Sequence, residues 1–303
     1  MKRSEAVFTV HTPDGWSLEI EEFPPADEST PIGTAVLTHA MMVDRRTYIR
    51  GGHGFAPFLA ERGWRVFAAD FRGRNRFGPV PAQGAQWSYD DLVSFDVPTI
   101  VASVRARVDD APLVYVGHSL GGHTGLAAAG ADLFDRPPDA YVCLSANIWR
   151  PSLEPNAYRR LKKSAQFWLF AQAARHIGYI PARAVRMGPC DEASTYALDL
   201  YRAWETDRWS SRDGRLDYTR LLAHIRPPVL SVVGQGDRLM AHPVGARAWF
   251  SDVGSQHADF WIAKKGDFGL SFDPDHMNVV TATASRPLWG AIENWMHRAL
   301  QGQ

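Results

Sequence analysis

The stretch Val114-Tyr115-Val116-Gly117-His118-Ser119-Leu120-Gly121-Gly122 decides the fold of this chain. Residues 113–116 are apolar, β-branched or aromatic, which predicts a buried strand. The small residues that follow, from Gly121 to Ala129, predict a helix. A G-x-S-x-G pattern at such a strand-to-helix turn holds its serine hydroxyl out at the top of a sheet. Because the serine backbone is strained there, the residues two before and two after it must be nearly free of side chain. The pattern therefore predicts that Ser119 is a nucleophile on a sharp turn.

Short apolar runs and helical patterns alternate on both sides of this turn. Because the runs are apolar throughout, we expect a mostly parallel sheet with helices on both faces. Two alternating runs joined by Pro13-Asp14-Gly15 predict an antiparallel hairpin at one edge of it. The expected strands are 6–11, 16–21, 34–38, 64–69, 113–116, 140–145, 227–234 and 260–264, and the expected helices are 55–62, 89–108 with a break at Pro98, 121–129 and 286–300.

The alternation fails once, over residues 148–222, where helical patterns follow one another without a strand. We interpret this segment as a helical cap over a core made of residues 1–147 and 223–303. Leu161, Ala165, Trp168 and Leu169 fall at helical spacing and predict one apolar face of an amphipathic helix. Packing against the main domain is the ordinary role for the aromatic residues here, and lining an acyl or ring pocket is the alternative. The tryptophans concerned are Trp149, Trp168, Trp204 and Trp209.

The whole-chain properties are those of a soluble globular protein. A chain of 303 residues buries about three quarters of its unfolded surface, enough for one large domain and an insertion. Its formal net charge is +0, so we expect no nucleic-acid partner. We expect no signal peptide and no stable membrane insertion, because no apolar stretch is long enough. Two cysteines, Cys143 and Cys190, give neither a disulfide framework nor metal-ligand spacing, which favours a reducing, cytoplasmic location.

A serine nucleophile needs a base, and the base needs a third group that holds it. We expect the acid and the histidine at later strand ends, in the order Ser, Asp, His. Asp237 ends the strand 227–234 in Gly234-Gln235-Gly236-Asp237, where glycines permit a tight turn. The alternative is that Asp237 caps the helix that starts near Pro243. The preceding strand is followed by Ser145-Ala146-Asn147, which offers no competing carboxylate.

The base is either His257 or His276. His257 precedes the expected strand 260–264 and would lie at the amino-terminal edge of a parallel sheet. His276 follows that strand, and catalytic groups collect at the carboxyl ends of such strands. We therefore assign the base to His276. We expect His118 to point away from the nucleophile and His123 to be a helix-face residue.

A tetrahedral oxyanion needs two backbone N–H donors, each with an effect of about 10²- to 10³-fold on the rate. Leu120, directly after the nucleophile, is predicted to supply one. Met41, in the loop after the strand 34–38, is our candidate for the other.

With these residues in place, the chain resembles the α/β-hydrolase superfamily, in its serine esterase and lipase-like branch. The resemblance rests on Gly117-His118-Ser119-Leu120-Gly121-Gly122, on Asp237 after a late strand and on His276 near the end. It implies an eight-stranded, mostly parallel sheet, a serine–histidine–acid triad, and no cofactor or metal. His39-Ala40-Met41 stands where many members carry His-Gly-x, and this departure leaves the second oxyanion donor open.

Two further motifs bear on the branch of the family. Asp70-Phe71-Arg72-Gly73 resembles a loop of many esterases, lipases and epoxide hydrolases. Epoxide hydrolases and dehalogenases carry an aspartate as the elbow nucleophile, so Ser119 argues against both. Residues 87–98 are weakly similar to a helix of acid-lipase-like members, which favours acyl esters.

The expected cap is rich in basic residues. Between Arg150 and Arg186 the only carboxylate is Glu154. A solvated helix face is the ordinary interpretation, and a surface that meets a carboxylate, a phosphopantetheine group or a membrane is the alternative. The basic residues are Arg150, Arg159, Arg160, Lys162, Lys163, Arg175, Arg183 and Arg186.

Our main hypothesis is a serine hydrolase that cleaves a carboxylic ester through an acyl-enzyme. The partner would be a small-molecule ester or acyl substrate, and a homodimer stays open. The same triad could serve a thioesterase, an acyltransferase or a carbon–carbon bond hydrolase. A ligand-binding protein that keeps the fold without catalysis is a more remote alternative, since Ser119, Asp237 and His276 are all present.

Overall fold

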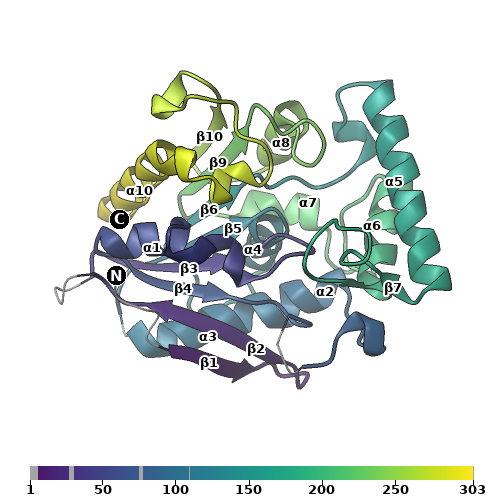
Figure 1. The fold of residues 1–303 in the computed structure, drawn as a ribbon, viewed down its shortest axis with the longest axis horizontal. Helices are drawn as coiled ribbons and strands as arrows, with labels where there is room; N and C mark the ends of the chain where they lie inside the picture. Colours follow the sequence, from purple (N-terminus) through teal and green to yellow (C-terminus); the bar gives the residue numbers. More distant parts are fainter. Residues whose placement is uncertain (1–5, 27–30, 75–77, 109, 303) are drawn as a thin grey trace.

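A central sheet organises the computed structural model, which describes residues 6–26, 31–74, 78–108 and 110–302 (Figure 1). The strand order is β1-β2-β4-β3-β5-β6-β9-β10. β1 and β2 form an antiparallel hairpin at one edge, β2 pairs antiparallel with β4, and the remaining pairs are parallel. The predicted eight-stranded, mostly parallel sheet is confirmed. The strands are β1 (Ala6–His11), β2 (Ser17–Phe23), β3 (Thr34–Thr38), β4 (Arg65–Ala69), β5 (Leu113–His118), β6 (Ala140–Leu144), β9 (Val229–Gly234) and β10 (Ala258–Ala263).

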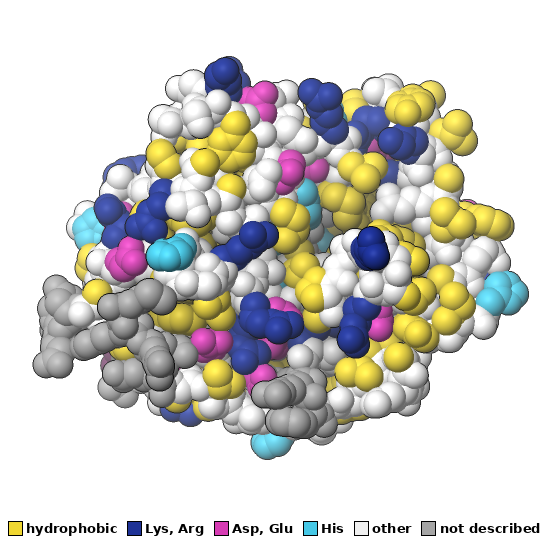
Figure 2. Space-filling model, in the orientation of Figure 1, with side chains coloured by type: hydrophobic (Ala, Val, Ile, Leu, Met, Phe, Trp, Pro, Cys, Tyr) yellow, Lys and Arg dark blue, Asp and Glu magenta, His cyan; other side chains and the backbone are white. Residues whose placement is uncertain are grey.

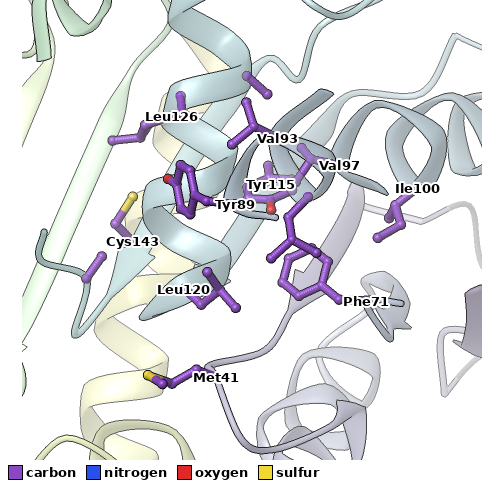
Figure 3. Close-up of a cluster of buried hydrophobic side chains, with 14 of the residues drawn as sticks. Met41, Phe71, Tyr89, Val93, Val97, Ile100, Tyr115, Leu120, Leu126 and Cys143 are labelled. Carbon is purple, nitrogen blue, oxygen red and sulfur yellow. The ribbon is translucent and has the colours of Figure 1, made fainter. Parts of the chain in front are cut away.

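Helices bury both faces of this sheet, which explains why its central strands are apolar without alternation. Val114 and Val116 of β5 face a cluster built with α1 and α10, whereas Leu113 and Tyr115 face a second cluster built with α3 and α4. Figure 3 shows Tyr115 and Cys143 from the strands among Val93, Val97 and Leu126 from the helices. The helices are α1 (Phe55–Glu61), α2 (Tyr89–Asp91), α3 (Val97–Val108), α4 (Leu120–Gly130), α8 (Pro243–Phe250), α9 (Asn278–Thr281) and α10 (Arg286–Gln301). Short 3₁₀ turns are η1 (Arg45–Tyr48), η2 (Arg50–Gly52), η3 (Pro81–Gln83), η7 (Asp267–Gly269) and η8 (Thr283–Ser285).

The helix predicted over residues 89–108 is divided by a π-helical turn, η4 (Leu92–Asp96), rather than by Pro98 alone. Asp96, at the end of this turn, is fully buried and accepts hydrogen bonds from the backbone N–H and the Nε of Arg72, each at 2.8 Å. Arg72 also donates to Asp14 in the turn of the first hairpin, at 2.7 Å. The Asp-x-Arg-Gly motif therefore has a structural role at its arginine, which ties three distant segments together.

A helical excursion, residues 148–222, leaves the sheet between β6 and β9, and its helices α5 (Ala157–His176) and α6 (Ser194–Thr206) lie at the right of Figure 1. Its two long helices, α5 and α6, pack against each other. It also holds a two-stranded antiparallel pair, so the expectation of a segment without strands is wrong in this detail. The elements are η5 (Pro151–Leu153), α5 (Ala157–His176), β7 (Tyr179–Ile180), β8 (Glu192–Ala193), α6 (Ser194–Thr206), α7 (Tyr218–Leu221) and η6 (Leu222–His224).

The apolar face predicted for α5 points to solvent. Leu161, Trp168 and Leu169 are 71%, 53% and 59% exposed. The helix packs instead through another face, made of Lys163, Phe167, Phe170, Ala171 and Ala174. The Phe167 ring lies 5.1 Å from that of Trp204 and 5.2 Å from that of Trp149, so three large rings anchor this side. The helix thus carries two apolar stripes, of which aromatic packing selects one.

We expect Gly121→Ala to destabilise the fold while Gly290→Ala does not. A Cβ at Gly121 would lie 2.4 Å from the carbonyl oxygen of Thr38, whereas a Cβ at Gly290, inside α10, meets nothing within 4 Å. Overpacking costs about 1–3 kcal/mol, and replacing a helical glycine such as the half-buried Gly290 by alanine gains up to about 1 kcal/mol. Urea unfolding of both variants measures the difference. Equal effects would show that β3 and α4 are not in this close contact.

Candidate active site

Ser119 occupies a sharp turn between β5 and α4, as the G-x-S-x-G pattern predicts. Its backbone has φ 50° and ψ −108°, a strained conformation for a residue with a side chain. The Ser119 N–H donates to the carbonyl of Leu144 at 2.8 Å and fixes the turn to β6. A Cβ at Gly117 would lie 2.3 Å from the Gly121 carbonyl carbon, so strand and helix approach this closely only through glycine.

Asp237 and His276 meet although they are 39 residues apart. Asp237 Oδ2 lies 2.6 Å from His276 Nδ1, and Asp237 is 2% exposed. Burial acts to raise the pKa of Asp237, but the hydrogen bond and charge interaction with His276 outweigh it and lower that pKa. The N-cap of α8 is His242, so the alternative role of Asp237 as the cap of this helix is wrong. His257 precedes β10 at the amino-terminal edge of the sheet, as expected.

The glycines before Asp237 let its loop pack against the loop that carries His276. The Gly236 N–H donates to the carbonyl of Pro274 at 2.9 Å. A Cβ at Gly234 would lie 2.0 Å from that same oxygen. Asp237 Oδ1 accepts from the Met240 N–H at 2.9 Å, which holds the carboxylate in place for His276. Close backbone packing and one turn therefore fix the orientation of the acid.

His118 connects the serine turn to the histidine loop. Its Nε2 lies 2.9 Å from the carbonyl oxygen of His276, and the two rings are 5.1 Å apart. Because a carbonyl only accepts, we assign the proton to Nε2. Burial, with a smaller contribution from His276, lowers the pKa of His118 to about 3, so its ring is neutral. The prediction that His118 points away from the nucleophile did not include this contact. Strand alternation puts the His118 side chain on the same face of β5 as Val116, which packs toward α10. The loop that carries His276 runs along that face.

His118→Phe is expected to lower kcat by about 10- to 100-fold, because the carbonyl of His276 loses its donor and a loop shift of ~1 Å misplaces the ring. His118→Gln restores a donor and should recover most of kcat. Steady-state kinetics and thermal unfolding of both variants measure this. A purely structural role predicts instead a lower Tm with unchanged kcat in the folded protein, and no advantage for Gln.

The two predicted oxyanion donors have amides without partners. Neither the Leu120 N–H nor the Met41 N–H donates to any residue that the structure describes. The next amide, Met42 N–H, donates to Glu192 Oε1 at 2.5 Å, and the Met42 carbonyl accepts from Cys190 N–H at 3.0 Å. Ala40 has no positive φ, so alanine fits where the family carries glycine.

Glu192 and Arg74 hold the Met41 loop against the helical excursion. Both side chains are buried and form an ion pair, and Arg74 Nε donates to the carbonyl of Val43 at 3.0 Å. Met42 has a φ of 61°, a conformation that these bonds maintain. Sequence reasoning missed both residues.

A small pocket lies beyond the serine turn, between α4 and the excursion. Its walls include Tyr89, His123, Trp149 and Trp209. His123 is buried one helical turn after Ser119 and bonds to the Tyr89 hydroxyl at 2.9 Å, so it faces the interior rather than an open helix face. Asn147, which also lines the pocket, is 4% exposed and pairs neither amide atom with a described residue.

Within the described ranges there is neither a candidate metal cluster nor a candidate membrane-spanning helix. No group of three or more His, Cys, Asp or Glu side chains there is arranged to hold a metal ion. Of the helices with described coordinates, none combines the length and apolar character that crossing a membrane requires.

Comparisons with known proteins support the fold described above. Two curated relatives align over about a third of their own length: human lipase member N, 24% identical over 135 residues (40% of this chain, 33% of the relative), and triacylglycerol lipase 2 of Arabidopsis thaliana, 27% identical over 134 residues (39% and 32%). Among solved structures, monoglyceride lipase of Saccharomyces cerevisiae, as a soluble variant, superposes with a TM-score of 0.67 at 15% identity, covering 98% of both chains. Monoacylglycerol lipase of Paleococcus ferrophilus gives 0.61 at 17% identity, covering 93% of this chain and 99% of that one.

A family model matches most of the segment that contains the sheet, the serine turn and the acid–histidine pair. The model for the alpha/beta hydrolase fold matches residues 48–269, more than half of the chain, and includes Ser119 and Asp237. The chain therefore belongs to the α/β hydrolase fold family.

Proposed function

We propose that this protein hydrolyses a carboxylic ester with Ser119, His276 and Asp237 as its triad. The observation that carries the proposal is the 2.6 Å contact between Asp237 and His276, on a loop that His118 binds to the serine turn. Ser119 Oγ itself forms no hydrogen bond to His276 in this structure. Catalytic hydrogen bonds are often loose without substrate and tighten in the reacting complex.

The contacts of the proposed triad support a role for each group. With Nδ1–H donated to Asp237, the lone pair of His276 Nε2 is free to accept the serine proton. Ser119 Oγ attacks the ester carbonyl, the tetrahedral intermediate collapses, and His276 returns the proton to the leaving alcohol. A water molecule then gives a proton to His276 and attacks the acyl-enzyme, and the acid is released as Ser119 regains its proton.

Leu120 and Met41 N–H are proposed to stabilise the oxyanion. Their lack of partners leaves both amides able to donate when charge develops on the carbonyl oxygen. The Met42 N–H donates to Glu192, which fixes the orientation of the Met41–Met42 peptide. The excursion is proposed to act as a cap that shapes the substrate site, with the aromatic pocket next to His123 receiving a partly apolar group.

A fluorescent fluorophosphonate tests the nucleophile, and p-nitrophenyl esters from acetate to palmitate test the reaction. We expect one label per chain, mapped by peptide mass spectrometry to Ser119, and a chain-length optimum for turnover. Heat-denatured protein, which should not be labelled, is the control. Labelling without turnover of any ester would redirect the search to thioesters, acyl acceptors or carbon–carbon bonds. Labelling of another residue, or none, would refute the triad.

A further inference from the structure

A cationic cleft of about 510 Å³ lies between α5 and the loop that carries Asp237, and it shares no lining residue with the pocket beside His123. One wall is the first two turns of α5. The other is the loop after β9, together with Asp273 from the loop that leads to His276. The lining residues are Tyr158, Arg159, Lys162, Lys163, Gln235, Arg238, Leu239, His242 and Asp273.

Positive charge in this cleft exceeds the negative charge that faces it. Lys163 Nζ and Arg159 Nε share one carboxylate, Glu154, with Arg159 at 2.8 Å. Lys162 lies over the Tyr158 ring at 5.6 Å, and neither Lys162 nor Arg238 has a carboxylate partner in the described part of the chain. The opposing carboxylate in the lining, Asp273, accepts from the Lys265 N–H at 2.8 Å. The side chains of Lys162 and Arg238 are therefore available to bind an anion.

The helix that carries Lys162 and the segment that follows it also carry exposed apolar side chains. Of the eleven large hydrophobic residues exposed in the described ranges, seven fall between Tyr158 and Met187, and Leu239 of the cleft is another. Residues 155–190 hold seven Lys or Arg and no Asp or Glu. Figure 2 shows hydrophobic and basic side chains gathered together at the upper right, over the upper part of α5. Tyr158, 69% exposed, belongs to both the cleft and the apolar stripe.

We propose that this cleft binds the phosphate headgroup of an anionic phospholipid, with the exposed stripe of α5 against the lipid surface. Arginine and lysine are the side chains that recognise phosphate. A cationic face beside exposed Leu and Trp is the combination that holds a helix at an anionic interface. A soluble phosphate ester would satisfy Lys162 and Arg238 but would leave Leu161, Trp168 and Leu169 uncovered. The site lies outside the proposed catalytic groups and does not depend on the proposed reaction.

Co-sedimentation with vesicles tests the proposal on the full chain. We expect binding to phosphatidylglycerol vesicles at least tenfold tighter than binding to phosphatidylcholine vesicles. The double variant Lys162→Glu/Arg238→Glu should lose at least tenfold more affinity than Arg160→Glu/Arg183→Glu. The second pair changes the net charge equally but lies outside the cleft lining. Circular dichroism and thermal unfolding establish that each variant is folded.

Three outcomes would decide against the proposal. Equal losses in the two double variants would mean diffuse attraction without a site. Equal binding to both kinds of vesicle would mean apolar docking without headgroup recognition. Binding of monomeric dihexanoyl-phosphatidylglycerol by calorimetry, without binding to vesicles, would identify the ligand as a soluble phosphate ester. Leu161→Ser/Leu169→Ser should weaken vesicle binding several-fold, and no change would remove the lipid surface from the proposal.

Discussion

Ser119→Ala is expected to lower kcat for ester hydrolysis by about 10⁵- to 10⁶-fold, because loss of a triad nucleophile removes nearly all of the triad's contribution. The variant should keep its fold. The strain at φ 50° is carried by the backbone, which alanine shares, and Ser119 Oγ has no hydrogen bond to lose. Burst-phase and steady-state assays with the preferred nitrophenyl ester measure the loss, with fluorophosphonate labelling as an independent readout.

The matched control for Ser119→Ala is Ser145→Ala. Ser145 also has a positive φ, 48°, and a buried hydroxyl without a partner in the described residues, but it directly follows β6 instead of the elbow strand β5. We expect Ser145→Ala to change kcat by less than about threefold. If Ser119→Ala kept even a hundredth of the wild-type turnover, or if Ser145→Ala abolished it, the nucleophile would lie elsewhere.

The elbow and the triad candidates could be located from sequence because local sterics and strand order fix them. Gly117 and Gly121 are required by contacts that form within a few residues or against the adjacent β3. Asp237 and His276 follow the last two strands of the sheet, and parallel strands bring their carboxyl ends to one edge. The proximity of Asp237 and His276 therefore follows from the order of the strands alone.

The Glu192 contacts could not be predicted, because they depend on where the excursion returns to the core. Glu192 reaches an amide 150 residues earlier in the chain, and nothing local distinguishes it from a solvent-exposed glutamate. The packing face of α5 could not be predicted for a related reason. Leu161 and Trp168 satisfy helical periodicity as well as Phe167 and Phe170 do, and only the position of Trp149 and Trp204 decides which pair is buried.

Asp237→Asn is expected to lower kcat by about 10⁴-fold while leaving the site geometry nearly unchanged. The carboxylate only accepts, so His276 presents Nδ1–H to it and keeps Nε2 free for the serine proton. An amide NH₂ facing Nδ1 would donate, which moves the ring proton to Nε2 and leaves no base. Because the pKa of Asp237 is lowered in the folded state, its ionised form stabilises the fold above about pH 4, and this stability is lost as pH falls through the folded pKa.

Asp273→Asn is the control that separates orientation from charge. It removes one negative charge from the neighbouring loop, the one that leads to His276, but Asp273 accepts from the Lys265 amide and does not contact His276. We expect a change in kcat of less than about threefold for this variant. Comparing kcat for both variants between about pH 5 and 9, and their unfolding free energy from about pH 2 to 7, measures the difference. Equal losses of kcat in the two variants would mean that Asp237 acts only through its negative charge. A fully active Asp237→Asn would mean that another group orients His276 and that the hydrogen bond at 2.6 Å has only a structural role.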